Sequence, residues 1–539
     1  MRPPAWTAVL TAFPLAAAGA CAVPQPSRHP GPPALADLRP APRDHVRDGG
    51  VLRWPLPSFP GQWNFNQVNG MDGVSELVLR GLMPFTMVSD ERGEVRPHPD
   101  YLLSARVLAG PRERQVVRYR VNPRARWSDG RPLGYRDFAA QARALSGRDG
   151  RFRAATEAGY RQIASVRRGR GDTEVLVVFR KPFADWKALF NPLYPARTNS
   201  SPELFNEGWR GRIPVTAGPF KPGVLDEAGQ TITLVRDPGW WGRPAKLDEI
   251  RFRALAAAAR AGAFANRELD LLEAGDDPGA YRRGAALPWA EVRRAAGPDW
   301  RHLTLNARRG PLADPSVRRA LLLALDRGLL ARAALEQLDS PVRTLGSHFL
   351  TEGRPGYRDL APAPDVGLAR ALLAGAEPAL EYVVPAGNAA HREEAELIQA
   401  MLARAGFRVR LRAVPQNELI SGHVLRGDFD LVSFSWLGTP FPVADMASVF
   451  TRGGGQNFTG TGGARLDALL ARAGRELDAA RGAVLLGEAD ALLWEQAAVI
   501  PLYQRPQLMV VDRDLVNVGA RGLRHLRYED IGRYGRGSP

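Results

Sequence analysis

A mostly apolar run, Phe429–Trp436, sets the first limit on how this chain can fold. Its length and its bulky or β-branched residues are typical of a buried strand. Gly438 and two prolines follow closely, and because proline cannot donate a hydrogen bond to a sheet, the strand must end there. Open α/β sheets bind ligands beyond their strand ends, which makes Trp436, Gly438 and Thr439 candidate ligand contacts. A core position for Trp436 beneath the proline-rich loop fits these residues equally well.

The chain has 539 residues, enough for two or three domains at roughly 100 to 200 residues per domain. Apolar residues make up 45% and charged residues 24%, as in ordinary globular proteins. The net charge of +16 is compatible with a nucleic-acid partner. Only four of the 73 basic residues are lysines, however, and the arginines are scattered, as codon usage in a GC-rich genome would produce. Clusters such as Arg167–Arg170 lack interleaved aromatic residues, so we expect solvent or anionic lipid beside them and no nucleic acid.

Cys21 is the single cysteine, which excludes a disulfide within the chain. Arg2, an apolar segment from Ala5 to Ala18 and a few small residues precede it, in the order of a secretory signal. The apolar segment is shorter than the roughly 20 residues of a spanning helix. The whole resembles a bacterial lipoprotein signal, in which Cys21 becomes the lipidated first residue and holds the protein at the outer face of the cell membrane. An ordinary signal peptide with an incidental cysteine is the alternative.

Residues 22–48 are rich in proline and poor in large apolar side chains. Such a composition predicts an extended spacer that forms no core of its own. We therefore expect a lipoprotein signal peptide at 1–20 and a proline-rich tether at 21–48. Folding is expected to start at residue 49.

Strand and helix patterns alternate from residue 49 onward. Runs of apolar or alternating residues predict strands at 49–54, 114–121, 173–180, 230–236, 408–411 and 499–504. Helical spacing predicts helices at 74–80, 186–193 and 389–404, and a further helix after an N-cap at Ser316. Gly406 should end the helix at 389–404, because glycine readily adopts the left-handed conformation of a C-cap.

A turn is predicted at Ser128–Pro132. An Asp side chain accepts hydrogen bonds from the backbone just after it, and Gly tolerates a positive φ, so this Ser-Asp-Gly-x-Pro piece has the chemistry of a tight turn. Trp127 precedes it, and Asp137 and Phe138 lie in a helix that starts at Tyr135.

In this order the motifs resemble those of the extracytoplasmic solute-binding proteins of family 5, which serve dipeptide, oligopeptide and nickel ABC importers. The resemblance covers roughly residues 49–539, and the Trp127 turn with its following helix is its strongest part. It implies an α/β fold: a periplasmic-binding-protein-like, two-lobed clamp of type II, with the extra domain of oligopeptide-binding proteins. The implied domains are lobe 1 (domain I) at 49–88, 213–297 and 501–539, accessory domain II at 89–212, and lobe 2 (domain III) at 298–500.

The sequence lacks the patterns of several kinds of site. None of its eight histidines pair at a helical metal-ligand spacing. No glycine-rich stretch continues into Lys-Ser or Lys-Thr, so no nucleotide-binding loop is expected, and no nucleophile-elbow sequence is present. We therefore predict a binding protein without metal, cofactor or catalytic residues, rather than an enzyme.

The resemblance implies a ligand held between the lobes by aromatic faces and backbone groups. For each candidate, local packing or loop capping is the alternative. The candidate ligand-binding residues are Trp63, Asn66, Phe85, Trp436, Gly438, Thr439, Asn457, Phe458 and Tyr503.

One departure from the family pattern concerns the amino group of the ligand. Oligopeptide-binding members carry, after the Trp, an Asp that holds the ligand's α-amino group. Here Thr439 or a neighbour stands at that place, and the first carboxylate is Asp445. A buried ammonium without a carboxylate partner is costly. Either Asp445 reaches the ligand, or the ligand is not a peptide with a free amine.

The implied function is a lipid-anchored substrate-binding protein of an ABC importer. It would capture a peptide or another small solute outside the cell membrane and deliver it to the permease subunits for transport. We expect a monomer whose membrane contact is its lipid anchor. The alternative is a protein of the envelope on the same fold, which regulates cell-wall or glycolipid assembly without transport.

Overall fold

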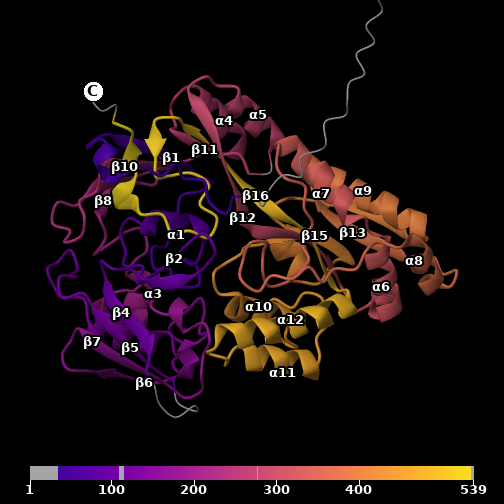
Figure 1. Cartoon of the computed structure of the whole chain (residues 1–539), viewed down its shortest axis with the longest axis horizontal. Helices are drawn as coiled ribbons and strands as arrows, with labels where there is room; N and C mark the ends of the chain where they lie inside the picture. Colours follow the sequence, from indigo (N-terminus) through magenta and orange to yellow (C-terminus); the bar gives the residue numbers. More distant parts are fainter. Residues whose placement is uncertain (1–33, 109–114, 276, 536–539) are drawn as a thin grey trace, which may run out of the picture. The chain divides into compact units, whose positions relative to one another are not determined.

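Two long antiparallel strands, β12 (Ala290–Leu305) and β16 (Val499–Asp512), form the centre of a six-stranded sheet. This computed structural model describes residues 34–108, 115–275 and 277–535. The sheet order is β11-β16-β12-β15-β13-β14. Figure 1 shows the two long strands side by side, running from β11 toward β15. The other strands are β11 (Leu271–Glu273), β13 (Ala379–Pro385), β14 (Arg408–Val414) and β15 (Leu431–Trp436).

The pairing of β12 with β16 is interrupted at Gly297–Asp299, between the pairs formed by Ala296 and Trp300. On one side of the interruption β16 also pairs with β11, and on the other side β12 also pairs with β15. A Cβ atom at Gly297 would lie 2.4 Å from the carbonyl oxygen of Arg505, so only glycine fits there. Extra residues on one strand of an antiparallel pair bend it. We call Gly297–Asp299 the hinge segment.

Two four-stranded sheets lie outside this central sheet. The first has the order β1-β10-β9-β8, in which β1 and β10 are parallel, and the second has the antiparallel order β4-β5-β7-β6. A short hairpin, β2-β3, and the pair β17-β18 complete the strands. Their bounds are β1 (Val51–Leu56), β2 (Met87–Ser89), β3 (Val95–Pro97), β4 (Leu102–Val107), β5 (Val116–Val121), β6 (Ile163–Arg168), β7 (Glu174–Phe179), β8 (Phe220–Asp226), β9 (Thr231–Arg236), β10 (Glu249–Ala254), β17 (Leu515–Val516) and β18 (Gly532–Arg533).

Helices cover these sheets through residues at helical spacing. In the second four-stranded sheet, Tyr119 of β5 packs against Phe138 of α2, with ring centroids 5.3 Å apart. Along the central sheet, α9 buries Ile398 and Leu402, four residues apart on one face. The helices are α1 (Gly73–Leu79), α2 (Tyr135–Ala144), α3 (Pro202–Glu207), α4 (Ala257–Ala265), α5 (Pro278–Ala285), α6 (Pro315–Ala324), α7 (Arg327–Leu335), α8 (Val366–Leu373), α9 (Ala389–Ala405), α10 (Pro442–Phe450), α11 (Ala464–Ala473) and α12 (Ala479–Gln496).

Most predicted elements are present. The run at 429–436 forms β15 between β12 and β13, and Gly406 ends α9 with a φ of +107°. Two predictions about helices are wrong. Asp314, not Ser316, caps α6, because its side chain accepts from the Ser316 backbone N–H. The helix expected at 186–193 is a single 3₁₀ turn, Trp186–Ala188. A helix through residue 193 is disfavoured, because Pro192 disfavours the helical conformation of the residue before it.

Residues 34–48, expected to be part of an extended tether, instead pack on the folded protein; we call them the N-terminal strap. Asp37 forms an antiparallel bridge with Ala520, and the buried Val46 forms another with Tyr534. The carbonyl of Ala34 accepts from the N–H of Ala296 at 2.8 Å, next to the hinge segment. Composition misled the prediction because backbone bridges do not require large side chains. Cys21 and the predicted signal peptide lie outside the described residues, and the domain ranges remain a prediction.

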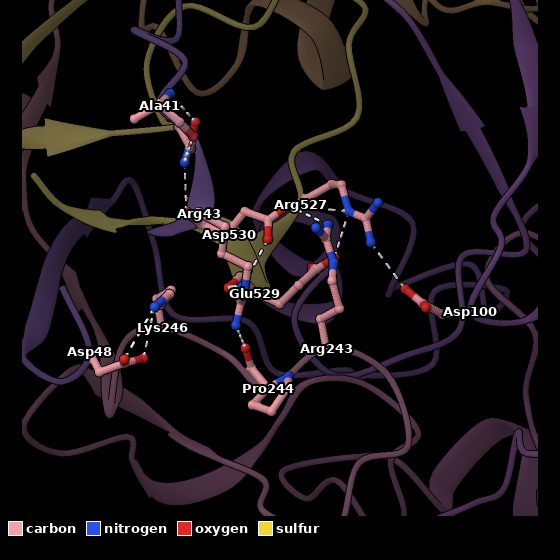
Figure 2. A network of polar contacts seen from close by, with 11 residues as sticks. Ala41, Arg43, Asp48, Asp100, Arg243, Pro244, Lys246, Arg527, Glu529 and Asp530 are labelled. Atoms are coloured by element: carbon pink, nitrogen blue, oxygen red, sulfur yellow. Dashed lines mark hydrogen bonds and ion pairs between the residues drawn. The ribbon is translucent and has the colours of Figure 1, made fainter. Parts of the chain in front are cut away.

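A network of charged side chains holds the strap (Figure 2). The carboxylate of Asp530 lies 2.9 Å from the guanidinium of Arg43 and 2.7 Å from that of Arg243. Arg527 joins it at 3.5 Å and also pairs with Asp100 at 3.2 Å. One carboxylate therefore links the strap, the segment before β10 and the C-terminal segment.

We expect Asp530→Ala to lower the free energy of unfolding by about 1 kcal/mol, because three partly exposed guanidinium groups lose a shared partner. Urea unfolding at low and at high salt measures the change, which should shrink at high salt through screening. Asp44→Ala is the control, since Asp44 is an exposed carboxylate on the same strap. An equal loss in both variants would contradict the assignment.

Candidate ligand-binding site

A cavity of about 320 Å³ lies where five segments of the chain meet. We call it the ligand cavity. Its volume is at the lower end of the roughly 300 to 1,000 Å³ of small-molecule sites. It is lined by Phe65, Asn66, Met71, Glu76, Arg80, Phe85, Met87, Ser89 and Val95, by Thr156, Ala158, Tyr160, Phe183, Ala188, Leu189 and Asn191, by Pro298, Gly438, Thr439, Pro440, Phe441 and Ala444, and by Arg521, Gly522, Leu523 and His525.

One wall is charged. Glu76 and Arg80, one turn apart on and just after α1, form an ion pair. Arg80 Nη1 donates to His525 Nδ1 at 2.5 Å, so this ring nitrogen must be unprotonated. Burial, followed by the charge of Arg80, lowers the pKa of His525 well below its ordinary value. His525 is therefore neutral, and Arg80 also lies over the ring of Phe85, 4.9 Å from its centroid.

Another part of the wall follows directly from the end of β15. The N–H of Gly438 donates to Asp299 Oδ1 at 3.1 Å, and Pro298 also lines the cavity. A Cβ at Gly438 would lie 1.9 Å from the carbonyl oxygen of Pro298. Arg354 donates to the carbonyl of Thr439 at 3.0 Å and holds the loop from its other side. This wall is thus attached to the hinge segment.

Four of the sequence-predicted candidates line the ligand cavity: Asn66, Phe85, Gly438 and Thr439. Asn66 Nδ2 is buried and has no hydrogen-bond partner among the described residues. Phe85 is almost fully buried and offers only the part of its ring that faces the cavity. These residues come from two distant parts of the sequence, which the fold brings to one place.

The other candidates lie elsewhere. Trp63 is fully buried in a core cluster. Tyr503 donates to Glu394 at 3.2 Å, away from the cavity lining. Asn457 closes its own loop, since its Nδ2 donates to the carbonyls of Thr451 and Thr461.

Trp436 and Phe458 form an aromatic stack at the end of β15. The Trp436 ring lies nearly parallel to those of His302 and Phe458, with centroids 5.6 and 6.0 Å away. Neither Trp436 nor Phe458 is among the residues that line the cavity. Asp445 belongs to α10, but its side chain lies outside the described part of the structure.

Sequence reasoning missed the residues that the C-terminal loop and residues 156–191 contribute. Tyr160, Phe183 and Asn191 approach the cavity from the segments around β6 and β7. Arg521 and His525 approach from the loop after β17. Glu76 and Arg80 carried one usable signal, the spacing of four residues at which opposite charges pair on a helix.

Within 34–108, 115–275 and 277–535, no group of three or more His, Cys, Asp or Glu residues is arranged to hold a metal ion. Over the same ranges, no helix has both the length and the apolar character needed to cross a bilayer.

Comparison with known proteins gives consistent results. The family model for bacterial extracellular solute-binding proteins, family 5 Middle, matches residues 113–458. The oligopeptide-binding protein OppA of Mycobacterium tuberculosis (strain ATCC 25618 / H37Rv) is 33% identical over 507 residues, covering 90% of this chain and 85% of OppA. The probable monoacyl phosphatidylinositol tetramannoside-binding protein LpqW of the same organism is 31% identical over 259 residues, covering 48% of this chain and 40% of LpqW.

A solved structure confirms the predicted fold class. The periplasmic EDTA-binding protein EppA matches with a TM-score of 0.84 at 24% sequence identity, covering 92% of this chain and 98% of EppA. The chain has the mixed α/β, two-lobed architecture of such periplasmic solute-binding proteins.

Proposed function

Because this chain belongs to family 5 of the bacterial extracellular solute-binding proteins, we propose that it captures a peptide or peptide-like solute and delivers it to the permease subunits of an ABC importer. The ligand cavity carries this proposal. Its walls come from segments attached to both sides of the hinge segment, so a bending motion there would open and close the site.

The lining suits a short peptide. Phe65, Phe85 and Phe183 offer apolar surface for side chains, and Asn66 and Arg521 offer hydrogen-bond donors for carbonyl or carboxylate oxygens. The similarity to OppA over 90% of the chain supports an oligopeptide as the class of ligand. The function requires binding and release only, so it needs no catalytic residues.

The location follows from the N-terminal sequence. Cys21 would carry the lipid, and the protein would act as a monomer at the outer face of the cell membrane. Metabolic labelling with a clickable fatty acid tests this: wild-type protein should be labelled and Cys21→Ala should not. Equal labelling of both would contradict the anchor.

Native mass spectrometry of the purified protein, followed by calorimetric titration with short peptides, tests the proposed function. We expect a monomer that retains small ligands. From the cavity volume, we also expect saturable binding of peptides roughly two to five residues long. Absence of binding for every peptide in a mixed library would overturn the proposal. As a control, the titration is repeated with protein unfolded in urea. Equal binding by the unfolded protein would show that the signal is non-specific.

Gly438→Ala should lower peptide affinity about tenfold, equivalent to roughly 1.4 kcal/mol. The added Cβ overlaps the carbonyl oxygen of Pro298, so the cavity wall or the hinge segment must shift. Gly455→Ala is the matched control, because its Cβ would meet no atom within 4 Å. Wild-type affinity in Gly438→Ala would show that this wall does not contact the ligand.

The similarity to LpqW favours a second candidate function, recognition of a mannosylated phosphatidylinositol at the envelope. That similarity spans 48% of this chain, which makes it narrower than the similarity to OppA. Flotation with vesicles containing such glycolipids, in parallel with vesicles lacking them, separates the two candidates. Glycolipid-dependent flotation without peptide binding would favour the second.

A further inference from the structure

Arg521 lies in the loop after β17, on one wall of the ligand cavity. Its backbone N–H and that of Gly522 both donate to Gln507 Oε1, each at 2.9 Å. Gln507 belongs to β16, so the loop is fixed to one of the two central strands. The side chain of Arg521 therefore starts from a rigid position beside the cavity.

The guanidinium of Arg521 forms no ion pair with any residue that the structure describes. Its side-chain hydrogen bond runs from Nη1 to the carbonyl of Arg524, at 3.4 Å. A guanidinium has five N–H donors, so most of them lack a described protein acceptor. Neighbouring arginines differ, because Arg80 pairs with Glu76 and Arg524 pairs with Glu91 at 2.6 Å.

The side chain of Arg521 is half-buried. Burial, followed by the charge of Arg80, lowers the pKa of Arg521, while Glu76 and Glu273 act in the opposite direction from beyond ion-pair distance. Arginine nonetheless stays protonated in proteins. A positive charge that is partly removed from water and has no close partner stabilises an anion placed beside it.

Asn66 supplies a second donor on the same cavity. Its Nδ2 is buried and unpartnered among the described residues, while its backbone N–H donates to Asn64 Oδ1 at 3.2 Å. A buried donor without an acceptor costs free energy, and a ligand oxygen would remove that cost. The cavity thus offers Arg521 and, after a side-chain rotation that turns its Nδ2 to the cavity, Asn66 as donors for ligand oxygens.

We propose that Arg521 binds a carboxylate of the ligand, so that the protein selects peptides with a free C-terminal carboxylate over their amides. This inference rests on the proposed function and adds a residue and a chemical criterion to it. A carboxylate matches the planar fork of a guanidinium and accepts two parallel hydrogen bonds from it. Asn66 donates to an oxygen of the same peptide.

The test compares one peptide as its free acid and as its C-terminal amide, by calorimetric titration. The wild-type protein should bind the acid roughly 10- to 100-fold more tightly, the range of a charge-assisted hydrogen-bonded pair. Arg521→Gln should bind both forms with the affinity that the wild-type protein has for the amide. Arg521→Lys should keep part of the preference, since it keeps the charge and loses the fork.

Arg524→Gln is the matched control, because Arg524 is a nearby arginine already paired with Glu91. It should keep the wild-type preference for the acid. Urea unfolding without ligand provides a second readout: Arg521→Gln should be as stable as the wild-type protein or more stable, because it removes an unpaired charge. A marked loss of stability would show that Arg521 has a structural partner and would count against the proposal.

The outcomes separate this inference from the proposed function. Equal binding of acid and amide by the wild-type protein, or an undiminished preference in Arg521→Gln, overturns the carboxylate site and leaves peptide binding intact. If neither form of any peptide binds, the proposed function fails. The carboxylate site is then decided by thermal shift with succinate: a shift that Arg521→Gln abolishes supports it, and no shift overturns it.

Discussion

Glu394→Ala should destabilise the folded protein by about 3–5 kcal/mol, the cost of leaving a buried cation without its partner. Arg301 of β12 donates to Glu394 of α9 through Nε at 3.0 Å and Nη2 at 2.9 Å. Their side chains are only 5% and 8% exposed. Ser433 Oγ at 2.6 Å and the hydroxyl of Tyr503 at 3.2 Å complete the acceptor positions of the carboxylate.

The position of this pair adds to its importance. Arg301 and Tyr503 lie on the two central strands, directly after the hinge segment, and form a pair in the β12–β16 ladder. Glu394 therefore joins both strands to α9 at the point where the interrupted pairing resumes. Its loss should loosen the same strands that position the cavity walls.

The effect depends on pH in a defined direction. Burial raises the pKa of Glu394, but the charge and hydrogen bonds of Arg301, with the bond from Ser433, outweigh it, so the pKa is lowered overall. The carboxylate therefore contributes stability above its unfolded pKa of roughly 4.3, and this contribution is lost as the pH falls through the lower folded pKa. Glu394→Gln should lack this part of the acid sensitivity.

Urea unfolding at neutral and at acidic pH measures both effects. Glu393→Ala is the matched control, because Glu393 is the exposed neighbour on the same helix. It should change the free energy of unfolding by less than about 0.5 kcal/mol. Similar losses for the two variants would show that the pair with Arg301 contributes little.

Asp137→Ala should destabilise the protein by about 2–4 kcal/mol, because it leaves three donors, two of them buried and one half-buried, without an acceptor. Asp137 accepts from the N–H of Gly134 at 3.0 Å, from Trp127 Nε1 at 3.2 Å and from the N–H of Ala196 at 2.8 Å. It thus joins the start of α2 to the turn before it and to a segment 59 residues later.

Asp129→Ala in the same motif is the comparison for Asp137→Ala. Asp129 pairs with Arg131 at 2.6 Å, but their side chains are 27% and 48% exposed. Such surface pairs contribute roughly 0–1 kcal/mol. Thermal and urea unfolding should therefore separate the two aspartates clearly, and equal effects would contradict the role assigned to Asp137.

Local chemistry made much of this fold predictable. Three features depend on side chains within a few residues and can therefore be predicted from the sequence. They are the Ser128–Pro132 turn, the start of α2 at Tyr135 and the glycine C-cap at Gly406. The strand at 429–436 could also be predicted, because its length, its composition and the prolines after it all indicate a strand that ends there.

The candidate site was less predictable. Gly438 and Thr439 follow a recognisable strand end, but Arg521 lies in a loop without periodicity, and only the fold brings it to the same cavity as Asn66. Trp436 was a candidate ligand contact because it stands at a strand end, yet its ring packs against His302 and Phe458. Such pairings join residues far apart in sequence and leave no local pattern.

The N-terminal strap fixes the point at which the preceding chain joins the body. Ala34 is bonded to β12 beside the hinge segment, close to the axis about which the cavity walls would rotate. In a rotation, displacement grows with distance from the axis, so this junction stays nearly still while the remote parts of each lobe swing. Capture and release of cargo would then leave the bond between the strap and β12 almost undisturbed.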